Sequence, residues 1–292
     1  MKDVVNNVIR AEKSVKRLLS IPLLIAVSTL FMISYIYLIP PLSSPILPDG
    51  VPSWFSSLGF GSLEGDLKVY LWRFFLTFVF FGVLPFLMIV ALGYKPGEVG
   101  LRFDFRNPRG AGFVFTRTFA LIIVIAVLSG IVGSLNSSIF DYYPYSKTLA
   151  GHIASFWRGG AFFKGLLLLV LHGLLYFFFY YVPWEFFFRG VLIFPLLEAV
   201  PGLSRSINRG EFKPLGPLML IALSIAAFQI IPSTMVHVGH PFVESLAAIV
   251  YGLYAAFITV YTRSIVPSLL THFTVGFFTD LFIVLRMTFF GG

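Results

Sequence analysis

The chain has 292 residues, of which 58% are hydrophobic and 18% aromatic, while only 12% are charged. This composition excludes a soluble domain of the same size, because too few polar side chains are available to cover its surface. The net charge of +8 does not indicate nucleic-acid binding, since the basic residues are scattered between apolar runs. The absence of cysteine excludes disulfides, thiolate metal sites and a cysteine nucleophile. We therefore expect an all-α polytopic transmembrane bundle of about seven to eight spans.

The first 160 residues predict an amphipathic segment followed by three membrane spans. Residues 1–17 combine basic side chains with an apolar stripe, which predicts a short helix lying on the membrane surface. Residues 18–160 contain the N-terminal transmembrane helices, with spans at about 18–39, 70–92 and 113–135. The first outer loop is acidic and the segment after the second span is basic. The positive-inside rule therefore places the N-terminus in the cytoplasm of a multi-pass cell-membrane protein.

Residues 161–292 form the predicted core of the protein. Its first apolar region, at about 161–197, is too long for one perpendicular span and contains Pro183, so it is tilted, kinked or broken in two. A basic loop follows and predicts a second cytoplasmic segment. Three further spans at about 217–235, 242–261 and 264–290 give seven in all, or eight if the first region is divided.

Glu185 and Arg189 lie inside the apolar region 161–197. A charged side chain near the bilayer centre costs about 3 kcal/mol even on a lenient insertion scale, so such residues usually face a protein interior or a wet cavity. The two are four apart, so on a helix they can pair. On its own the pair is equally consistent with a structural ion pair and with a functional site.

Two later spans also carry ionisable residues. His237 and His240 end the fifth span, Glu244 follows four residues later, and His272 shares a stripe of the last span with Asp280. Because three spans each carry a costly side chain, we expect Glu185, His237 and His272 to share a polar cavity. For His172, which has no polar neighbour in sequence, we expect a packing role with satisfied hydrogen bonds.

Three segments in this order resemble the motif regions of the CPBP family of intramembrane proteases, which includes type II CAAX prenyl endopeptidases and bacteriocin-processing enzymes. They are WEFFFRG at 184–190, HVGHPFVE at 237–244 and TRSIVPSLLTH at 262–272. GYKPGEVGLRF at 93–103 is similar to a weaker upstream feature of the same family. The resemblance implies an endopeptidase that cleaves a peptide or prenylated peptide within the membrane.

The resemblance also assigns residue roles. Glu185 matches the second glutamate of the first motif, Arg189 its arginine, and His237 and His272 the histidines of the second and third motifs. This chain departs from the family pattern at three positions, where the first glutamate, a phenylalanine and an asparagine or aspartate are replaced by Trp184, Ser233 and Gly276. The first glutamate is the residue to which the family's water activation is usually assigned, so Glu185 must take that role or the chemistry has changed.

The resemblance and the residue types permit a glutamate-activated water with histidine stabilisation, either without a metal or with a zinc ion on His237, His272 and Glu185. We favour the metal-free form. His240, Glu244 and Asp280 are candidates for auxiliary roles, Asp280 in place of the absent asparagine. Two alternatives stay open: a catalytically silent CPBP-like protein acting in binding or immunity, and, ranked below it because no internal repeat is visible, a proton-coupled transporter.

Overall fold

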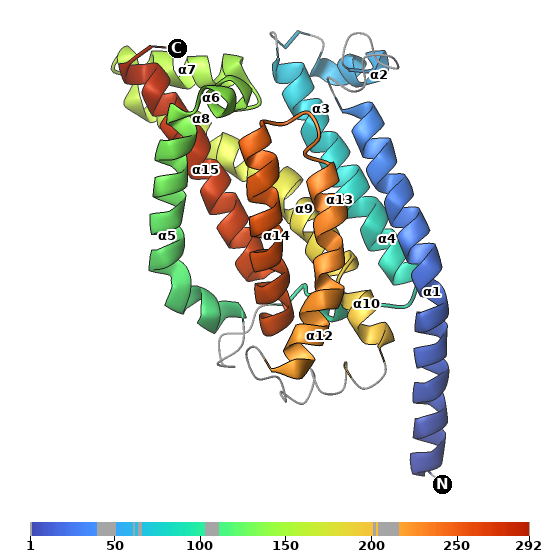
Figure 1. Ribbon diagram of the computed structural model, residues 1–292. Helices are drawn as coiled ribbons and strands as arrows, with labels where there is room; N and C mark the ends of the chain where they lie inside the picture. Colours follow the sequence, from blue (N-terminus) through green and yellow to red (C-terminus); the bar gives the residue numbers. More distant parts are fainter. Residues whose placement is uncertain are drawn as a thin grey trace.

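The computed structural model describes residues 2–39, 51–60, 62–63, 66–102, 111–200, 203 and 216–291. In the part of the chain that it describes, the regular elements are all helical. Seven helical segments are long and apolar enough to cross a membrane, which confirms an all-α polytopic bundle. The chain starts at one end of the bundle and finishes at the other, as an odd number of spans requires (Figure 1).

The first three spans and their connections occupy the N-terminal part of the bundle. Their elements are α1 (Lys2–Leu38), α2 (Ser53–Phe55), η1 (Ser56–Phe60), α3 (Leu67–Thr77), η2 (Phe78–Val83), α4 (Leu84–Ala91), η3 (Pro96–Val99), α5 (Ala111–Leu135) and α6 (Ser137–Tyr142).

The remaining elements form the rest of the bundle, with α7 lying across one end of it (Figure 1). They are α7 (Lys147–Arg158), α8 (Phe162–Tyr176), η4 (Phe177–Tyr181), α9 (Val182–Glu185), η5 (Phe186–Val191), α10 (Phe194–Ala199), α12 (Pro217–Ala226), η6 (Ala227–Gln229), α13 (Ile230–Met235), α14 (Phe242–Thr262) and α15 (Val266–Phe289).

Helix α1 corrects the prediction of a separate surface helix at residues 1–17. It runs from Lys2 to Leu38 without a break, and its N-terminal part projects beyond the bundle (Figure 1). A helix whose apolar stretch continues directly into a membrane span has no turn that would let its first part lie flat. Arg17, where the span begins, forms ion pairs with Glu98 (2.7 Å) and Glu198, and these tie α1 to η3 and α10.

Most of the residues on which the topology prediction rests lie outside the described residues. The basic residues at 106, 109, 205, 209 and 213, and the acidic residues at 49 and 64, fall in this group. The cytoplasmic placement of the N-terminus therefore stays a prediction.

The segment from α8 to α10 crosses the centre of the bundle. It counts as one apolar segment, Phe162–Ala199, because Pro183 lies in the first turn of α9, where a missing N–H is tolerated. The helix winds more loosely at η4 and η5, on both sides of that proline. Residues 183–195 are buried on every face, as expected for a helix that is apolar all round.

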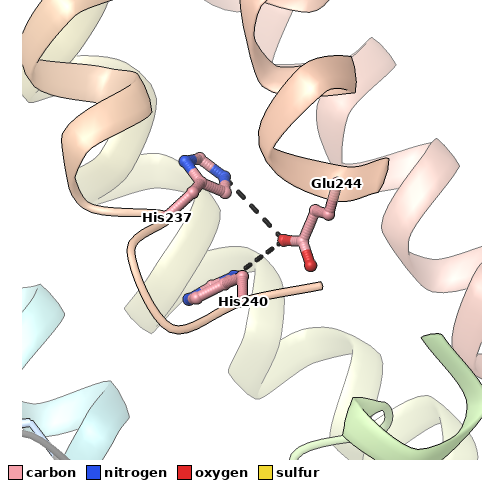
Figure 2. A group of neighbouring side chains, drawn as sticks. All are labelled: His237, His240 and Glu244. Carbon is pink, nitrogen blue, oxygen red and sulfur yellow. Dashed lines mark hydrogen bonds and ion pairs between the residues drawn. The ribbon is translucent and has the colours of Figure 1, made fainter. Parts of the chain in front are cut away.

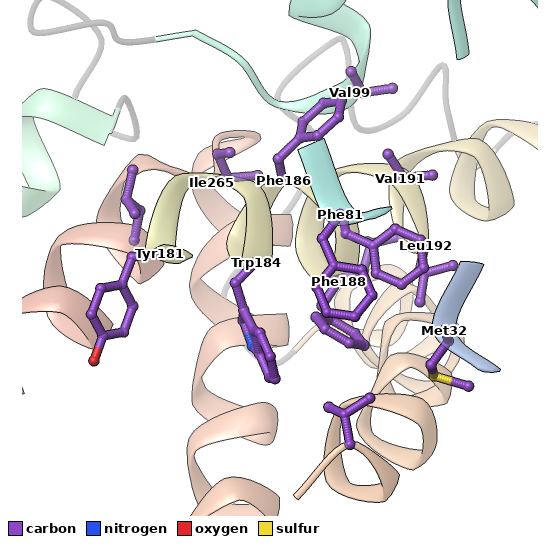
Figure 3. Close-up of a cluster of buried hydrophobic side chains, with 14 of the residues drawn as sticks. Met32, Phe81, Val99, Tyr181, Trp184, Phe186, Phe188, Val191, Leu192 and Ile265 are labelled. Atoms are coloured by element: carbon purple, nitrogen blue, oxygen red, sulfur yellow. The ribbon is translucent and has the colours of Figure 1, made fainter. Parts of the chain in front are cut away.

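Aromatic side chains form the core around this segment. Phe81 of η2 meets Trp184 edge-on at a centroid distance of 5.5 Å (Figure 3). Phe81 also stacks on Phe187 at 4.8 Å. Such pairs contribute about 0.5–1.5 kcal/mol each beyond the area they bury. They help to fix which face of η5 points toward η2 and α4 and which points toward α14.

The predicted N-terminal and core regions pack together in one bundle. Helix α5 runs along α15, and a Cβ at Gly130 would lie 2.7 Å from the carbonyl oxygen of Phe278, so the two backbones approach closely. The upstream segment 93–102 lies against the turn between α14 and α15, where the amide of Ile265 donates to the carbonyl of Gly100 (3.1 Å). Residues 93–102 and the segment at 262–272, which both resemble regions of the same family, are therefore neighbours in space.

Candidate functional site

Glu185 and His272 form the shortest contact between the predicted site residues. The end of α9 positions Glu185, and the second turn of α15 positions His272. His272 Nδ1 lies 2.7 Å from Glu185 Oε1. A carboxylate only accepts hydrogen bonds, so Nδ1 carries the proton and Nε2 has a free lone pair. Among the described residues no protein group hydrogen-bonds to Nε2.

Arg189 and Tyr251 complete the surroundings of Glu185. Arg189 Nε lies 3.4 Å from Glu185 Oε2, which confirms the predicted pairing four residues apart. Its Nη1 donates to Gln229 Oε1 (2.9 Å). The Tyr251 hydroxyl donates to the Ser268 carbonyl (2.8 Å) and lies 3.3 Å from Glu185 Oε1. Glu185 and Arg189 are almost fully buried, at 0% and 1% exposure, so each charge is compensated mainly by the other.

A cavity of about 410 Å³ lies between α5, α9, α13, α14 and α15. Arg189, His237, Tyr251 and His272 line it, whereas Glu185 lies behind them in the wall and contacts all of them except His237. Valine side chains from α5 and α14, Val132 and Val243, line it as well, and both are more than half exposed. The cavity therefore opens sideways between these two helices, toward the position of the lipid.

Trp184 occupies the wall position beside Glu185. Its ring stacks on Tyr180 (5.3 Å) and meets the His237 ring edge-on (5.6 Å). Trp184 therefore keeps this position at the cavity surface, and Glu185 does not replace it there. Glu185 instead faces α15, about 100° around the helix from Trp184. The expectation that Glu185 itself lies in the cavity is wrong, and His272 occupies that place.

His237 lies in the turn after α13 and is joined there by His240 and Glu244. His237 Nδ1 donates to the carbonyl of Ser233 (2.6 Å), and its Nε2 lies 3.8 Å from Glu244 Oε1. His240 Nδ1 lies 2.9 Å from the same oxygen, so both imidazoles face one carboxylate (Figure 2). The Tyr143 hydroxyl also donates to Glu244 Oε1 (2.7 Å).

Burial and, to a smaller extent, the nearby His240 lower the pKa of His237 to about 4, against the opposing effect of Glu244. His237 is thus neutral at physiological pH. With Nδ1–H committed to Ser233, its Nε2 accepts hydrogen bonds and does not donate them. His237 therefore does not supply the oxyanion hydrogen bond that the sequence suggested for it.

The zinc ligand set predicted from the sequence is not brought together. Among the described residues, one group of three or more ionisable side chains has ligand atoms within 4.8 Å of one another, and it contains His237, His240 and Glu244. His272 and Glu185 belong to the other end of the cavity. Two of the auxiliary candidates, His240 and Glu244, thus join His237.

Asp280, the third auxiliary candidate, lies in a different network. Its Oδ2 is 2.9 Å from His172 Nε2, and His172 Nδ1 is 2.7 Å from the Tyr70 hydroxyl. This confirms a satisfied packing role for His172. Because Asp280 faces α8 and does not line the cavity, it does not replace the family asparagine.

Tyr181 fills the space that Gly276 leaves in α15. A Cβ at Gly276 would lie 1.7 Å from the Tyr181 hydroxyl oxygen, so only glycine fits there. The Tyr181 ring also meets His272 edge-on (4.8 Å), and both residues line the cavity. A hydroxyl group from η4 thus takes the space of the missing side chain.

Sequence reasoning missed the residues that hold the charged groups in place. Gln229, a polar side chain inside an apolar span, carried a signal of the same kind as Glu185 and joins Arg189 to the Gly252 carbonyl (3.0 Å). The contact of Tyr143 with Glu244 was also missed, because nothing local in the sequence indicates it. Comparison with protein-family models, with curated protein sequences and with solved structures finds no match for this chain.

Proposed function

We propose that this protein is a membrane-embedded endopeptidase in which His272, oriented by Glu185, removes a proton from the attacking water. The observation that carries the proposal is the 2.7 Å contact between a fully buried carboxylate and an imidazole in the wall of a cavity. A carboxylate on Nδ1 fixes the tautomer and stabilises the imidazolium that forms when Nε2 takes a proton. The resemblance of the three motif segments to the CPBP family supports the same reaction.

The proposed reaction is hydrolysis without a covalent intermediate. Water attacks the peptide carbonyl carbon while its proton passes to His272 Nε2. The tetrahedral intermediate then breaks its carbon–nitrogen bond, and His272 returns the proton to the leaving amine. Arg189 lines the cavity and carries a positive charge, so we assign it the stabilisation of the oxyanion.

The sideways opening between α5 and α14 suits a substrate that is itself in the membrane. Small residues from two helices, Gly133 and Ala247, line the cavity beside the exposed valines, so an extended peptide or a prenylated peptide has room to approach His272. We place the protein in the cell membrane with a cytoplasmic N-terminus, following the charge pattern of the sequence.

The test uses the purified full chain in liposomes with single-span reporter peptides, and mass spectrometry identifies the fragments. We expect cleavage by the wild type and a loss of about 100- to 10,000-fold in His272→Gln, the usual effect of removing a general base. His152→Gln, at an exposed position of α7 outside the cavity, is the matched control and should cleave normally. Full cleavage by folded His272→Gln would contradict the proposal.

A binding function is the second candidate. It is favoured by the burial of Glu185 between Arg189 and His272, a network that also ties α9 and η5 to η6 and α15 as a structural ion pair would. A wild-type protein that retains the reporter peptide without cutting it would support this function. A proton-coupled transporter ranks below both.

A further inference from the structure

The cluster of His237, His240 and Glu244 lies at the opposite end of the cavity from the Glu185–His272 pair. We infer that His237 Nε2, His240 Nδ1 and a carboxylate oxygen of Glu244 bind one divalent transition-metal ion, with zinc the best match. The ion takes the place of the proton that His240 Nδ1 shares with Glu244, so the bound His240 carries its proton on Nε2. Two imidazoles and one carboxylate form a donor set that zinc uses in hydrolytic sites with an open fourth position. The inference stands apart from the peptidase proposal, because metal binding requires no turnover.

The spacing of the ligand atoms fits one small ion. Zinc lies about 2.1 Å from nitrogen and oxygen ligands, so two ligands of a tetrahedral site are about 3.4 Å apart. His240 Nδ1 and Glu244 Oε1 are 2.9 Å apart, and His237 Nε2 and the same oxygen are 3.8 Å apart. These two distances bracket the tetrahedral value, and all three ligand atoms lie within 4.8 Å of one another, so side-chain rotations can bring them around one ion.

The surrounding groups hold the ligands in the required orientation. The backbone carbonyl of Ser233 accepts a hydrogen bond from His237 Nδ1. The unprotonated Nε2 of His237 therefore faces Glu244 (Figure 2). The Tyr143 hydroxyl donates to the Glu244 carboxylate, and the Tyr142 ring packs against His240 at 4.7 Å. The second ring N–H of a metal-binding histidine usually donates a hydrogen bond to a carbonyl or carboxylate, as His237 Nδ1 does here. Ligating carboxylates usually accept hydrogen bonds from neighbouring groups, as Glu244 does.

One polar atom of the cluster has no partner in the protein. Glu244 Oε2 is buried, and it forms no hydrogen bond. A buried carboxylate oxygen without a partner carries a desolvation penalty, and a cation bound beside it would remove that penalty. His237 and Glu244 also line the cavity, so a ligand from the cavity can reach the fourth position of the ion.

The test measures metal binding directly and uses zinc alone as the probe. The detergent-solubilised full chain is stripped with a chelator and titrated with zinc by calorimetry, and elemental analysis gives the stoichiometry. We expect one equivalent in the wild type and affinity at least about 100-fold weaker in His240→Gln and Glu244→Gln, because even a supporting contact costs up to that factor. His152→Gln and His272→Gln are the matched controls and should bind like the wild type.

Three results would overturn the inference: no stoichiometric zinc in the folded wild type, unchanged affinity in both cluster variants, or loss of binding in His272→Gln with retention in His240→Gln. The last result would place the ion at the other end of the cavity. If a variant does not fold, cobalt(II) substitution of the wild type decides. An intense visible spectrum of four-coordinate cobalt supports the site, and the weak spectrum of hydrated cobalt contradicts it.

Discussion

Replacement of Gly276 by alanine tests whether Tyr181 fills the space beside α15. The new Cβ would lie 1.7 Å from the Tyr181 hydroxyl oxygen and 2.8 Å from Cζ. Since real Cβ contacts are essentially never shorter than 3.0 Å, the two groups must separate by at least 1.3 Å, the difference between 3.0 and 1.7 Å. Tyr181 packs against Tyr176 (4.7 Å) and His272 (4.8 Å), so it has little room to move.

Overpacking of this kind costs about 1–3 kcal/mol. We expect Gly276→Ala to lower the free energy of unfolding by about 2–3 kcal/mol, at the upper part of that range, because the oxygen blocks the position almost directly. Tyr181→Phe removes the oxygen and leaves only the 2.8 Å contact with Cζ, which falls 0.2 Å short of 3.0 Å. In the Tyr181→Phe background the alanine should therefore cost less than about 1 kcal/mol, so the two substitutions should be coupled by 1 kcal/mol or more.

The assay is unfolding in detergent micelles, followed by circular dichroism. Gly151→Ala is the matched control, because Gly151 lies in α7 with nothing within 4 Å of the added Cβ. That substitution should be neutral or stabilise by up to about 1 kcal/mol, the helix-propensity difference. The reasoning is refuted if Gly276→Ala is as well tolerated as Gly151→Ala, or if Tyr181→Phe leaves its cost unchanged.

Two further predictions concern the buried charges and the cavity. Glu185→Gln leaves the Arg189 charge without its partner, so the same unfolding assay should show a loss of about 3–5 kcal/mol; a loss below 1 kcal/mol would contradict a buried ion pair. Because the chain has no cysteine, Ala248→Cys in the cavity wall should react with a water-soluble maleimide, whereas lipid-facing Ile249→Cys should not. Equal reaction of the two thiols would argue against a water-filled cavity.

The sequence was sufficient to predict the spans and their number, because the length and apolarity of each segment are local properties. The pairing of Glu185 with Arg189 was predictable for the same reason, since it follows from spacing on one helix. Helix geometry also predicts that Trp184 and Glu185 point in directions about 100° apart. The contact between Glu185 and His272 depends on how α15 packs against α9, and the sequence does not show this.

The contacts that define the site depend on tertiary structure. His240 and Glu244 join His237 because the turn after α13 and the start of α14 fold back on each other, and Tyr143 reaches them from a segment about 100 residues away. Asp280 and His172 likewise meet across 108 positions. No pattern in one sequence specifies such distant pairs, so the structure does not bring the predicted zinc ligands together and places Asp280 outside the cavity.

The most direct test of the central claim is a double-mutant cycle of Glu185→Gln and His272→Gln on kcat/KM for reporter cleavage, measured on protein that remains folded in detergent. If Glu185 acts through His272, removing the imidazole already removes the effect of the carboxylate, as in catalytic groups that work as a unit. The account predicts that the double variant is no slower than His272→Gln alone. Losses that multiply in the double variant would show that the two residues act independently and would contradict it.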